Sequence, residues 1–405
     1  MKSTFLAAIA IAVLTASFVA EQAVSDNAKP AALTPEQRTQ RALELAAKEA
    51  RAAAKEPKLN CLTKSPKKPR FAVTDKVWPA EPGQAHLCLW RNDQLAAFSF
   101  TIDDNCAPDH PWWLERSKAI GFKITWFVIT GRANTGGYWG TWDQWKRLRA
   151  AGHDIQSHTV THLHPEKPGW QSVNWEYADS IRQIQENMPG HKVLTLAYPG
   201  GKLSRINSRE IAAKYFIAAR GTRGTLNAPN TIDYFNVNAT GALHLDDSVR
   251  GQWANVRNLL DKTRYRGRHY RGWGVYLSHG VKAPQKQALG KLFEFIRTHR
   301  DKFWLGTFTE VARYGQQRDT ATLKVTKADP AAVRFTLTDR VDDKLFDYPL
   351  TVKVRVKDAW KTVATTQGDK PVEAKVVEHD GGRFALVQAI PDRGQVVLVP
   401  GKGKP

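Results

Sequence analysis

The sequence predicts an α/β fold in which a parallel sheet or (β/α) barrel is followed by a small all-β module. Apolar runs alternate with amphipathic stretches from about residue 93 to residue 315, which is the rhythm of βαβ units. After Asp319 the pattern changes to short alternating segments such as RFTLT and RFALVQAI, as in a small β-sandwich. With 405 residues, 42% hydrophobic and 24% charged, the composition excludes a wholly disordered chain and a multi-span membrane protein.

The N-terminus has the layout of a secretory signal peptide. Lys2 precedes an apolar run that is too short to span a membrane, and small residues follow it, so we expect residues 1–20 to be cleaved on export. Residues 21–70 predict a helical spacer and a Pro/Lys-rich linker, 71–318 the barrel, and 319–405 the β module. We therefore expect a secreted or periplasmic protein with no transmembrane anchor and no nucleic-acid partner.

The elements of the predicted barrel follow from the apolar pattern. Strands are expected over residues 95–102, 123–129, 153–157, 193–198, 215–219, 273–278 and 303–306. Helices are expected over residues 112–120, 141–151, 174–187, 249–264 and 284–300. Three cysteines, at 61, 88 and 106, allow three different disulfide pairings in an exported chain, and the sequence does not choose among them or against a reduced set.

Polar clusters stand where three predicted strands end. Asp103 and Asp104 follow the first strand, His158 and His162 follow the third, and His279 ends a later one. Side chains at the carboxyl ends of barrel strands converge on one mouth, so a His₂Asp metal set with open coordination positions is expected there. Taken singly, an Asp-Asp pair is more often a turn or cap, and a lone His is more often a core residue. Their joint occurrence in this order favours the metal site.

The motifs that carry these residues resemble a known family. The chain contains TIDD at 101–104, SHTVTH at 157–162, AYPGG at 197–201 and LSH at 277–279. This order is similar to that of the polysaccharide deacetylases of carbohydrate esterase family 4, over roughly residues 93–315. The resemblance implies a distorted (β/α) barrel and one divalent metal ion, most often zinc, with cobalt, nickel or manganese as alternatives.

The resemblance also implies roles for individual residues. Asp104, His158 and His162 would hold the metal, Asp103 would be the general base, and His279 the general acid. The backbone N–H at Gly200 would help to bind the oxyanion, with Tyr198 in the same substrate-binding motif.

The chain departs from the family pattern in its third motif. Ala197 stands where the family often has the arginine that orients the base, and Arg220 or Arg223 are candidates to replace it. Gly280 replaces an aspartate that often follows the last histidine. The candidates for an Asp-rich fourth motif are Asp233, Asp246 and Asp247.

Two features bear on the substrate. Trp112, Trp139 and Trp170 lie in loop-like contexts near strand ends, where they are candidates to stack on sugar rings, although packing roles are equally expected. The net charge of +21 includes a dense run at 262–271, which contains Arg264 and Arg266. This run is either a solvated loop or a clamp for carboxylate or sulfate groups of an acidic glycan.

The function that these features predict is a metal-dependent carbohydrate deacetylase. Its reaction would be hydrolysis of N-acetyl groups on an oligo- or polysaccharide, that is, of a carbon–nitrogen bond other than a peptide bond, to give acetate and an amino sugar. One alternative is an O-acetyl esterase on an acetylated glycan. Another is a carbohydrate-binding protein without catalysis, which would have no use for the retained acid and base residues.

Overall fold

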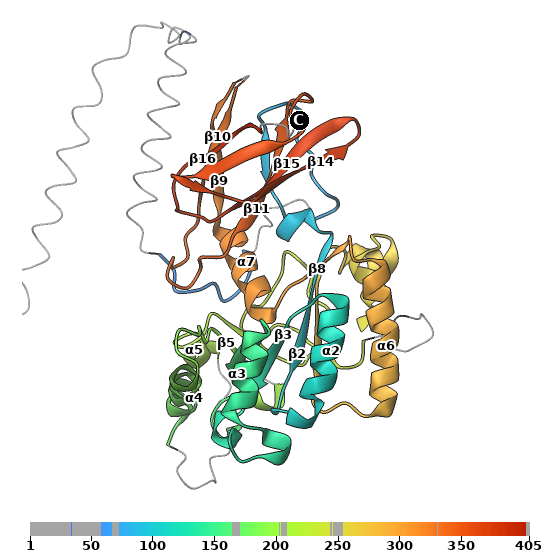
Figure 1. Ribbon diagram of the computed structural model, residues 1–405, viewed down its shortest axis with the longest axis vertical. Helices are drawn as coiled ribbons and strands as arrows, with labels where there is room; N and C mark the ends of the chain where they lie inside the picture. The colour runs from blue at the N-terminus through green and yellow to red at the C-terminus, as the bar shows by residue number, and fades with distance from the viewer. Residues whose placement is uncertain are drawn as a thin grey trace, which may run out of the picture. The chain divides into compact units, whose positions relative to one another are not determined.

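The computed structural model describes most of the chain from Lys58 onward, and this part belongs to one compact unit (Figure 1). The described residues are 34, 58–66, 73–163, 171–201, 203, 209–243, 245, 254–329 and 331–401. The predicted signal peptide and almost all of the predicted helical spacer lie outside them, as do Trp170, Asp246 and Asp247.

A parallel sheet of seven strands forms the core of the larger part. Its strands are β2 (Ala96–Ile102), β3 (Ile124–Val128), β4 (Asp154–Ser157), β5 (Thr195–Ala197), β6 (Ala218–Arg220), β7 (Trp273–Ser278) and β8 (Phe303–Leu305). The order is β6-β5-β4-β3-β2-β7, with β8 also paired to β2, and every pairing is parallel. Both faces of this sheet are buried, which explains why its strands are near-continuous apolar runs. All seven strands predicted from the sequence are confirmed.

The sheet curls into the predicted distorted barrel. Residues 237–240 lie between its two outer strands, because Val237 pairs with Arg220 at the end of β6 and Thr240 pairs with Tyr276 in β7. These isolated bridges take the place of an eighth strand and bring the ends of β6 and β7 towards each other. The predicted α/β fold class is thereby confirmed.

Helices surround the sheet and start at well-capped ends. They are α2 (His110–Ile120), α3 (Trp142–Ala150), α4 (Val173–Asn187), α5 (Arg209–Ala212), α6 (Ala283–Thr298) and α7 (Phe308–Thr320). Short 3₁₀ helices are η1 (Arg91–Asp93), η2 (Ala107–Asp109), η3 (Thr130–Arg132), η4 (Gly137–Trp139), η5 (Pro199–Gly201), η7 (Val256–Leu259) and η8 (Arg264–Gly267). Thr141 caps α3 and Thr307 caps α7 with capping boxes, which satisfy backbone N–H groups that have no partner inside the helix.

The predicted helix at 249–264 is wrong over its described part, residues 254–264. The side chain of Asn255 accepts a hydrogen bond from the N–H of Arg257, and only the short η7 follows. Tyr265 and Arg266 then adopt left-handed backbone angles, which no α-helix tolerates. Local side-chain bonds of this kind compete with the helical ladder and explain why an amphipathic pattern did not become a helix.

The helix α7 was missed because it is buried on all sides. Its last turns carry Gln316, Gln317, Arg318 and Asp319, which are polar in sequence but buried in the structure. Arg318 pairs with Asp319 at 2.7 Å and lies over the ring of Trp90, so the buried charges are compensated. The last turns are therefore easily taken for an exposed segment in the sequence, because the partners that compensate their polar side chains are set by the tertiary structure.

The C-terminal module is a β-sandwich, as predicted. Its strands are β1 (Ala85–Leu87), β9 (Thr322–Ala328), β10 (Val333–Thr338), β11 (Leu350–Val356), β12 (Val363–Gln367), β13 (Lys370–Pro371), β14 (Ala374–His379), β15 (Gly382–Ala389) and β16 (Val396–Pro400). They form two antiparallel sheets, β1-β11-β15-β14 and β13-β12-β16-β10-β9. The strand β1 comes from the range predicted for the barrel and pairs with β11, so the chain crosses between the two parts before the barrel begins.

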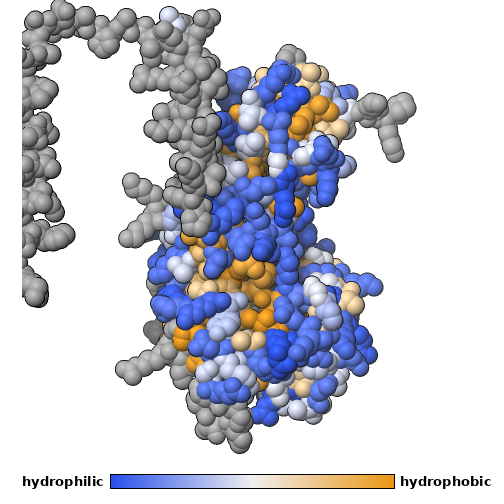
Figure 2. Space-filling model, turned by 90° about the vertical axis from the view of Figure 1, so that its left-hand side faces the viewer, coloured by the Kyte–Doolittle hydropathy of each residue, from blue (hydrophilic) through white to orange (hydrophobic). Residues whose placement is uncertain are grey.

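The described surface is largely polar. Hydrophilic residues cover much of the face in Figure 2, and apolar residues gather at its middle height. None of the described helices combines the length and the hydropathy needed to cross a bilayer.

Candidate active site

The three predicted polar clusters meet at the carboxyl ends of neighbouring strands. Asp103 and Asp104 follow β2, His158 follows β4, and His279 follows β7. The sheet order places β7 beside β2 on one side and β3 and β4 on the other, so these ends lie along one edge. Residues far apart in sequence therefore face one mouth, as the fold class requires.

Asp104, His158 and His162 form a donor set that fits a divalent metal ion. Each offers one ligand atom, and these atoms lie within 4.8 Å of one another. The Asp104 Oδ1 atom is 3.4 Å from His158 Nε2 and 3.8 Å from His162 Nε2. Ligand atoms at about 2.1 Å from a tetrahedral zinc ion lie roughly 3.4 Å apart, so the spacing suits such an ion. Asp104 Oδ1 is buried with no hydrogen-bond partner among the described residues, which is expected of an oxygen that serves as a metal ligand.

The backbone fixes which nitrogen of His158 faces the set. Its Nδ1 atom lies 2.8 Å from the carbonyl oxygen of Ala197, which can only accept a hydrogen bond, so Nδ1 carries the proton. The lone pair of the neutral ring is then on Nε2, which faces Asp104. This backbone contact orients the imidazole as a metal ligand.

The electrostatics of the set favour the ionised carboxylate. Burial opposes ionisation of Asp104, but the nearby His158, His279 and His162 outweigh that cost and lower the pKa of Asp104 to about 2. Burial likewise disfavours the charged form of His158, yet Asp103 and Asp104 together raise its pKa above the ordinary value. The site thus concentrates negative charge where a cation would bind.

Unusual backbone angles aim these side chains. Asp104, Asn105 and Cys106 are three successive residues with positive φ, at 56°, 66° and 47°. The Asn105 side chain stabilises this turn by accepting from the N–H of Ile129 at 2.9 Å and donating to the carbonyl of Trp139 at 2.9 Å. Left-handed conformations at non-glycine residues cost free energy and persist where the surroundings enforce them, typically at functional sites.

Glu176 on α4 holds the loop that carries both histidines. Its side chain is fully buried, and Oε2 accepts from the N–H groups of Val160 and Thr161 at 2.7 and 2.8 Å. The Thr161 hydroxyl donates to Oε1. The loop between His158 and His162 is therefore bound to a helix of the scaffold. No sequence motif pointed to this residue, because its partners lie in a different segment.

Replacing Glu176 with Ala is expected to weaken metal binding without removing a ligand. Three donors lose their acceptor, at a cost of about 1–3 kcal/mol each where they are buried. A residue that orients a ligand loop typically contributes 10- to 100-fold in metal affinity. Competition with a chelator dye measures this affinity, and Glu176→Gln, which keeps an acceptor oxygen, serves as the milder control. Equal affinities in wild type and Glu176→Ala would contradict the assignment.

Arg220, a candidate to replace the arginine missing from the third motif, pairs with Asp103. The Arg220 guanidinium is fully buried and its Nη2 atom donates to Asp103 Oδ2. Ala197 on β5 and Arg220 on β6 are direct register partners, so the arginine stands one strand away at the same level of the sheet. The sequence left Arg220 and Arg223 open as candidates, and the structure selects Arg220.

His279 and Tyr138 border the open side of the donor set. The Nε2 atom of His279 is 3.6 Å from Asp104 Oδ2, and its side chain is 56% exposed. Tyr138 is 39% exposed, and its ring lies beside Gly280, with Cε2 3.7 Å from the point where a Cβ on that glycine would be. Sequence reasoning missed Tyr138 and chose its neighbour Trp139. A large exposed aromatic beside the mouth is a natural contact for a sugar ring.

The part of the chain that carries the donor set is similar to a known protein family. Residues 93–217 match the family model described as polysaccharide deacetylase. This segment contains Asp103 and the three members of the donor set, Asp104, His158 and His162. Residues 93–217 belong to the polysaccharide deacetylase family. The family implies a hydrolase that acts on an amide or ester bond of an acetylated glycan.

A curated relative of this chain has a different activity in its name. It is a gellan lyase from Bacillus sp., 38% identical over 354 residues, which cover 81% of this chain and 14% of that protein. Among solved structures, the Streptococcus pyogenes deacetylase PplD in complex with acetate is 24% identical, with a TM-score of 0.29 over 32% of this chain and 57% of that one. The Xyl-CE4 domain of a multidomain xylanase from the hindgut metagenome of Trinervitermes trinervoides is 16% identical, with a TM-score of 0.33 over 54% and 89% of the two chains.

Two third-motif residues of the deacetylase domain have different environments. Gly200 is exposed, with φ 67°, and an added Cβ would meet nothing within 4 Å, so its backbone is accessible from solvent. Tyr198 is fully buried, and its hydroxyl has no hydrogen-bond partner among the described residues. The structure therefore brings the Tyr198 side chain into the core and not to the mouth.

The other predicted substrate contacts are Trp112, Trp139 and two arginines of the 262–271 run. Trp112 on α2 stands between Phe293 and Lys286 of α6, with its ring 5.4 Å from the lysine nitrogen. Trp139 packs against Arg132 at 5.2 Å, next to Tyr138. Arg264 and Arg266 precede the start of β7, whereas His279 follows its end. The structure does not bring these two arginines together with the catalytic mouth of the deacetylase domain.

Several other polar groups among the described residues have partners of their own away from the donor set. A second cluster consists of Asp339, Asp343 and Asp392, which surround the amino group of Lys58. This amino group lies 2.9 Å from Asp392 and offsets part of the negative charge of the cluster. Asp233, a candidate for the fourth motif, pairs instead with Arg209. All three cysteines are free thiols. Burial raises the pKa of Cys61 to about 11 and that of Cys106 to about 12, so both stay protonated.

Proposed function

We propose that the protein is an exported, metal-dependent deacetylase that hydrolyses N-acetyl groups of an oligo- or polysaccharide. The observation that carries the proposal is the buried Asp103–Arg220 pair beside the Asp104, His158 and His162 donors. A binding protein would need neither an oriented base nor a donor set with an unpartnered oxygen. The signal-like pattern of residues 1–20 supports export, and the mass of the exported protein tests it, because retention of these residues would contradict cleavage.

The donor set suits one divalent ion, with zinc as the first choice and cobalt, nickel or manganese as alternatives. Two imidazole nitrogens and one carboxylate oxygen are ligands that zinc accepts in catalytic sites, where further positions stay open. When bound, such an ion supplies Lewis acidity and lowers the pKa of a coordinated water molecule.

Asp103 is the general base in this proposal. Its Oδ2 atom accepts from Arg220 and is 3.9 Å from His158 Nε2, so it lies directly beside the donor set. Its other oxygen, Oδ1, is buried without a partner among the described residues and is available to take a proton. The guanidinium holds the orientation of this carboxylate beside the donor set, as a general base requires.

His279 is the general acid for the leaving group. Its exposed ring follows β7 and lies 3.6 Å from Asp104 Oδ2, whereas His158 lies 3.4 Å from Asp104 Oδ1. An amine leaves an N-acetyl amide only when it is protonated, so this residue has to deliver a proton. The accessible backbone at Gly200 is a candidate donor to the oxyanion, and Tyr138 and Trp139 border the approach of the sugar.

The second candidate is O-acetyl ester hydrolysis by the same site. The observation in its favour is Gly280, which leaves His279 without the acidic neighbour that the family often provides. An alcohol is a better leaving group than an amine and depends less on a general acid. The choice between the two therefore rests on the strength of proton delivery from His279.

Acetate release from matched substrates tests the proposal. The purified protein is incubated with N-acetylated chito-oligosaccharides and with O-acetylated xylo-oligosaccharides, and acetate is measured. We expect faster release from the N-acetyl substrate and a loss of about 10²–10⁴-fold in His279→Ala, the usual contribution of general acid catalysis. Faster release from the O-acetyl substrate, with little effect of His279→Ala, would support the esterase. No release from any acetylated glycan would favour a binding protein.

A further inference from the structure

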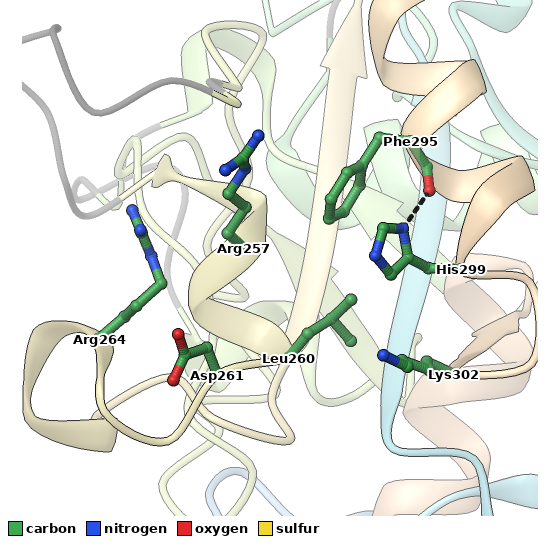
Figure 3. A pocket seen from close by; sticks show the side chains of 7 residues that line it. All are labelled: Arg257, Leu260, Asp261, Arg264, Phe295, His299 and Lys302. Carbon is green, nitrogen blue, oxygen red and sulfur yellow. Dashed lines mark hydrogen bonds between the residues drawn. The ribbon is translucent and has the colours of Figure 1, made fainter.

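A pocket of the described barrel lies near the starts of β7 and β8, at the opposite end of these strands from the donor set. Its lining residues are Arg257, Leu260, Asp261, Arg264, Phe295, His299 and Lys302, and its volume is about 370 Å³ (Figure 3). We call it the basic pocket. Its walls are η7, η8, the last turn of α6 and the loop before β8. The six residues of β7 separate it from His279, which corresponds to about 20 Å.

The charge of the basic pocket is positive. Arg257, Arg264 and Lys302 contribute cations, and Asn258 orients Arg264 by accepting from its Nε atom at 3.2 Å. The one carboxylate, Asp261, is partly used, because its Oδ1 atom accepts from the N–H and the hydroxyl of Thr263 at 2.8 and 2.7 Å. An anion that enters this space meets three cations and a single acidic group. Sites of this composition favour carboxylate, sulfate or phosphate groups.

The arginine wall is built on a constrained turn. Tyr265, Arg266 and Gly267 have φ angles of 48°, 53° and 68°, all in the left-handed region. The ring of Tyr265 stacks on His269 with centroids 5.5 Å apart, which anchors the turn to a buried residue. This arrangement holds Arg264 toward the pocket and directs the neighbouring Arg266 into solvent, where it is not among the lining residues.

The remaining lining groups distinguish a sugar from an inorganic anion. Leu260 and Phe295 provide apolar surface, which a sulfate ion does not use but the C–H face of a sugar ring does. The Nδ1 atom of His299 donates to the carbonyl of Phe295 at 2.8 Å, so the neutral ring carries its lone pair on Nε2. Figure 3 shows the ring of His299 and the amino group of Lys302 directed towards the side of Leu260 and Arg257. The basic pocket therefore offers cations for a carboxylate, an acceptor nitrogen for a hydroxyl group and an apolar wall for the face of a sugar ring.

We propose that the basic pocket binds a uronate residue of an acidic glycan. This extends the proposed function, since it makes the deacetylase's glycan ligand anionic and gives it a second point of attachment. Two contacts on one polymer chain raise its effective concentration at the mouth without any new contact there. The dense positive run of the sequence then acts at a separate site, and not as a clamp beside the metal donors.

Binding of a non-acetylated probe tests the proposal independently of catalysis. Hexagalacturonate and its fully methyl-esterified form have the same backbone and differ in charge, and titration calorimetry measures both in the presence of chelator. We expect the acidic form to bind at least tenfold more tightly than the ester. The variant Arg257→Gln/Arg264→Gln should lose that preference, since each charge-assisted hydrogen bond contributes up to about tenfold in affinity.

A variant with the same charge change controls for net charge. Lys118→Gln/Lys214→Gln removes two exposed cations that do not line the basic pocket and should bind hexagalacturonate within twofold of wild type. Phe295→Ala should weaken binding of hexagalacturonate but leave that of sodium sulfate unchanged, and thermal melting confirms that each variant is folded. The proposal is overturned if the double arginine variant matches the lysine control, if ester and acid bind equally, or if sulfate binds as tightly as the oligosaccharide. Binding without acetate release from any glycan would instead contradict only the proposed function.

Discussion

Acetate release is expected to fall by at least ~10³-fold when His158 is replaced by Ala, with a similar loss on chelation of the wild type. The reason is that Lewis-acid stabilisation and water activation by a metal ion contribute several kcal/mol, and each 1.36 kcal/mol is a factor of ten in rate. His158 is the best-fixed member of the donor set, buried and oriented by the Ala197 carbonyl. Its removal leaves two donors, Asp104 and His162, which is too few for a stable catalytic site.

Metal content measured by mass spectrometry accompanies the activity assay. Wild type should hold one ion per chain and His158→Ala almost none, and added zinc should restore the chelated wild type but not the variant. A suitable control is His191→Gln, because His191 contacts the Ile155 carbonyl through Nε2 and is not in the donor set. Full activity after chelation, or unchanged metal content in His158→Ala, would rule out the metal assignment.

The second large effect is expected at Arg220. Replacing it with Met should lower kcat/KM by about 10²–10³-fold while one metal ion stays bound. Without the guanidinium, Asp103 is a buried carboxylate that lacks its countercharge, and an unpaired buried charge is costly enough to favour the protonated form. A protonated Asp103 cannot act as a base, so activity should recover as pH rises. The acid limb of the pH–rate profile is therefore expected to move to higher pH.

The strand register provides a rescue experiment for this arginine. Because Ala197 and Arg220 are register partners on adjacent strands, an arginine at 197 starts from the same level of the sheet. The double variant Ala197→Arg/Arg220→Ala should regain activity and the original acid limb relative to Arg220→Ala alone. The assignment would be contradicted if Arg220→Met lost activity with an unshifted pH profile and if Ala197→Arg did not restore activity to Arg220→Ala. Arg220 would then have only a packing role.

Much of the fold was predictable because parallel sheet strands are buried on both faces. Most of the seven strands are short apolar runs in sequence, and each overlaps its predicted range. The exceptions to a close match are β4, which is largely polar, and β6, which is found at 218–220 where 215–219 was predicted. The helix α7 escaped prediction for the opposite reason, since Gln316, Arg318 and Asp319 are satisfied by one another and by distant backbone. A pattern of apolar and polar residues predicts which side chains are buried only when the polar residues of the segment are exposed to water.

The residues of the donor set were also predictable, because they end strands that must share one edge. Asp104, His158 and His162 were named from motif order, and the structure brings their ligand atoms together. The support around them was not predictable. Glu176 acts through Val160 and Thr161, and its role depends on how α4 packs against a loop.

The sequence by itself determined the strand pattern, the order of the polar clusters and the large positive charge. Only the tertiary structure decided where that charge lies, because the parallel pairing of β7 puts Arg264, which precedes this strand, at the far end of the barrel from His279. It also decided that Arg220, one strand removed from Ala197, holds Asp103. The physical reason is the same in both cases. Strand direction and register, which depend on long-range pairing, set which side chains share an end of the sheet.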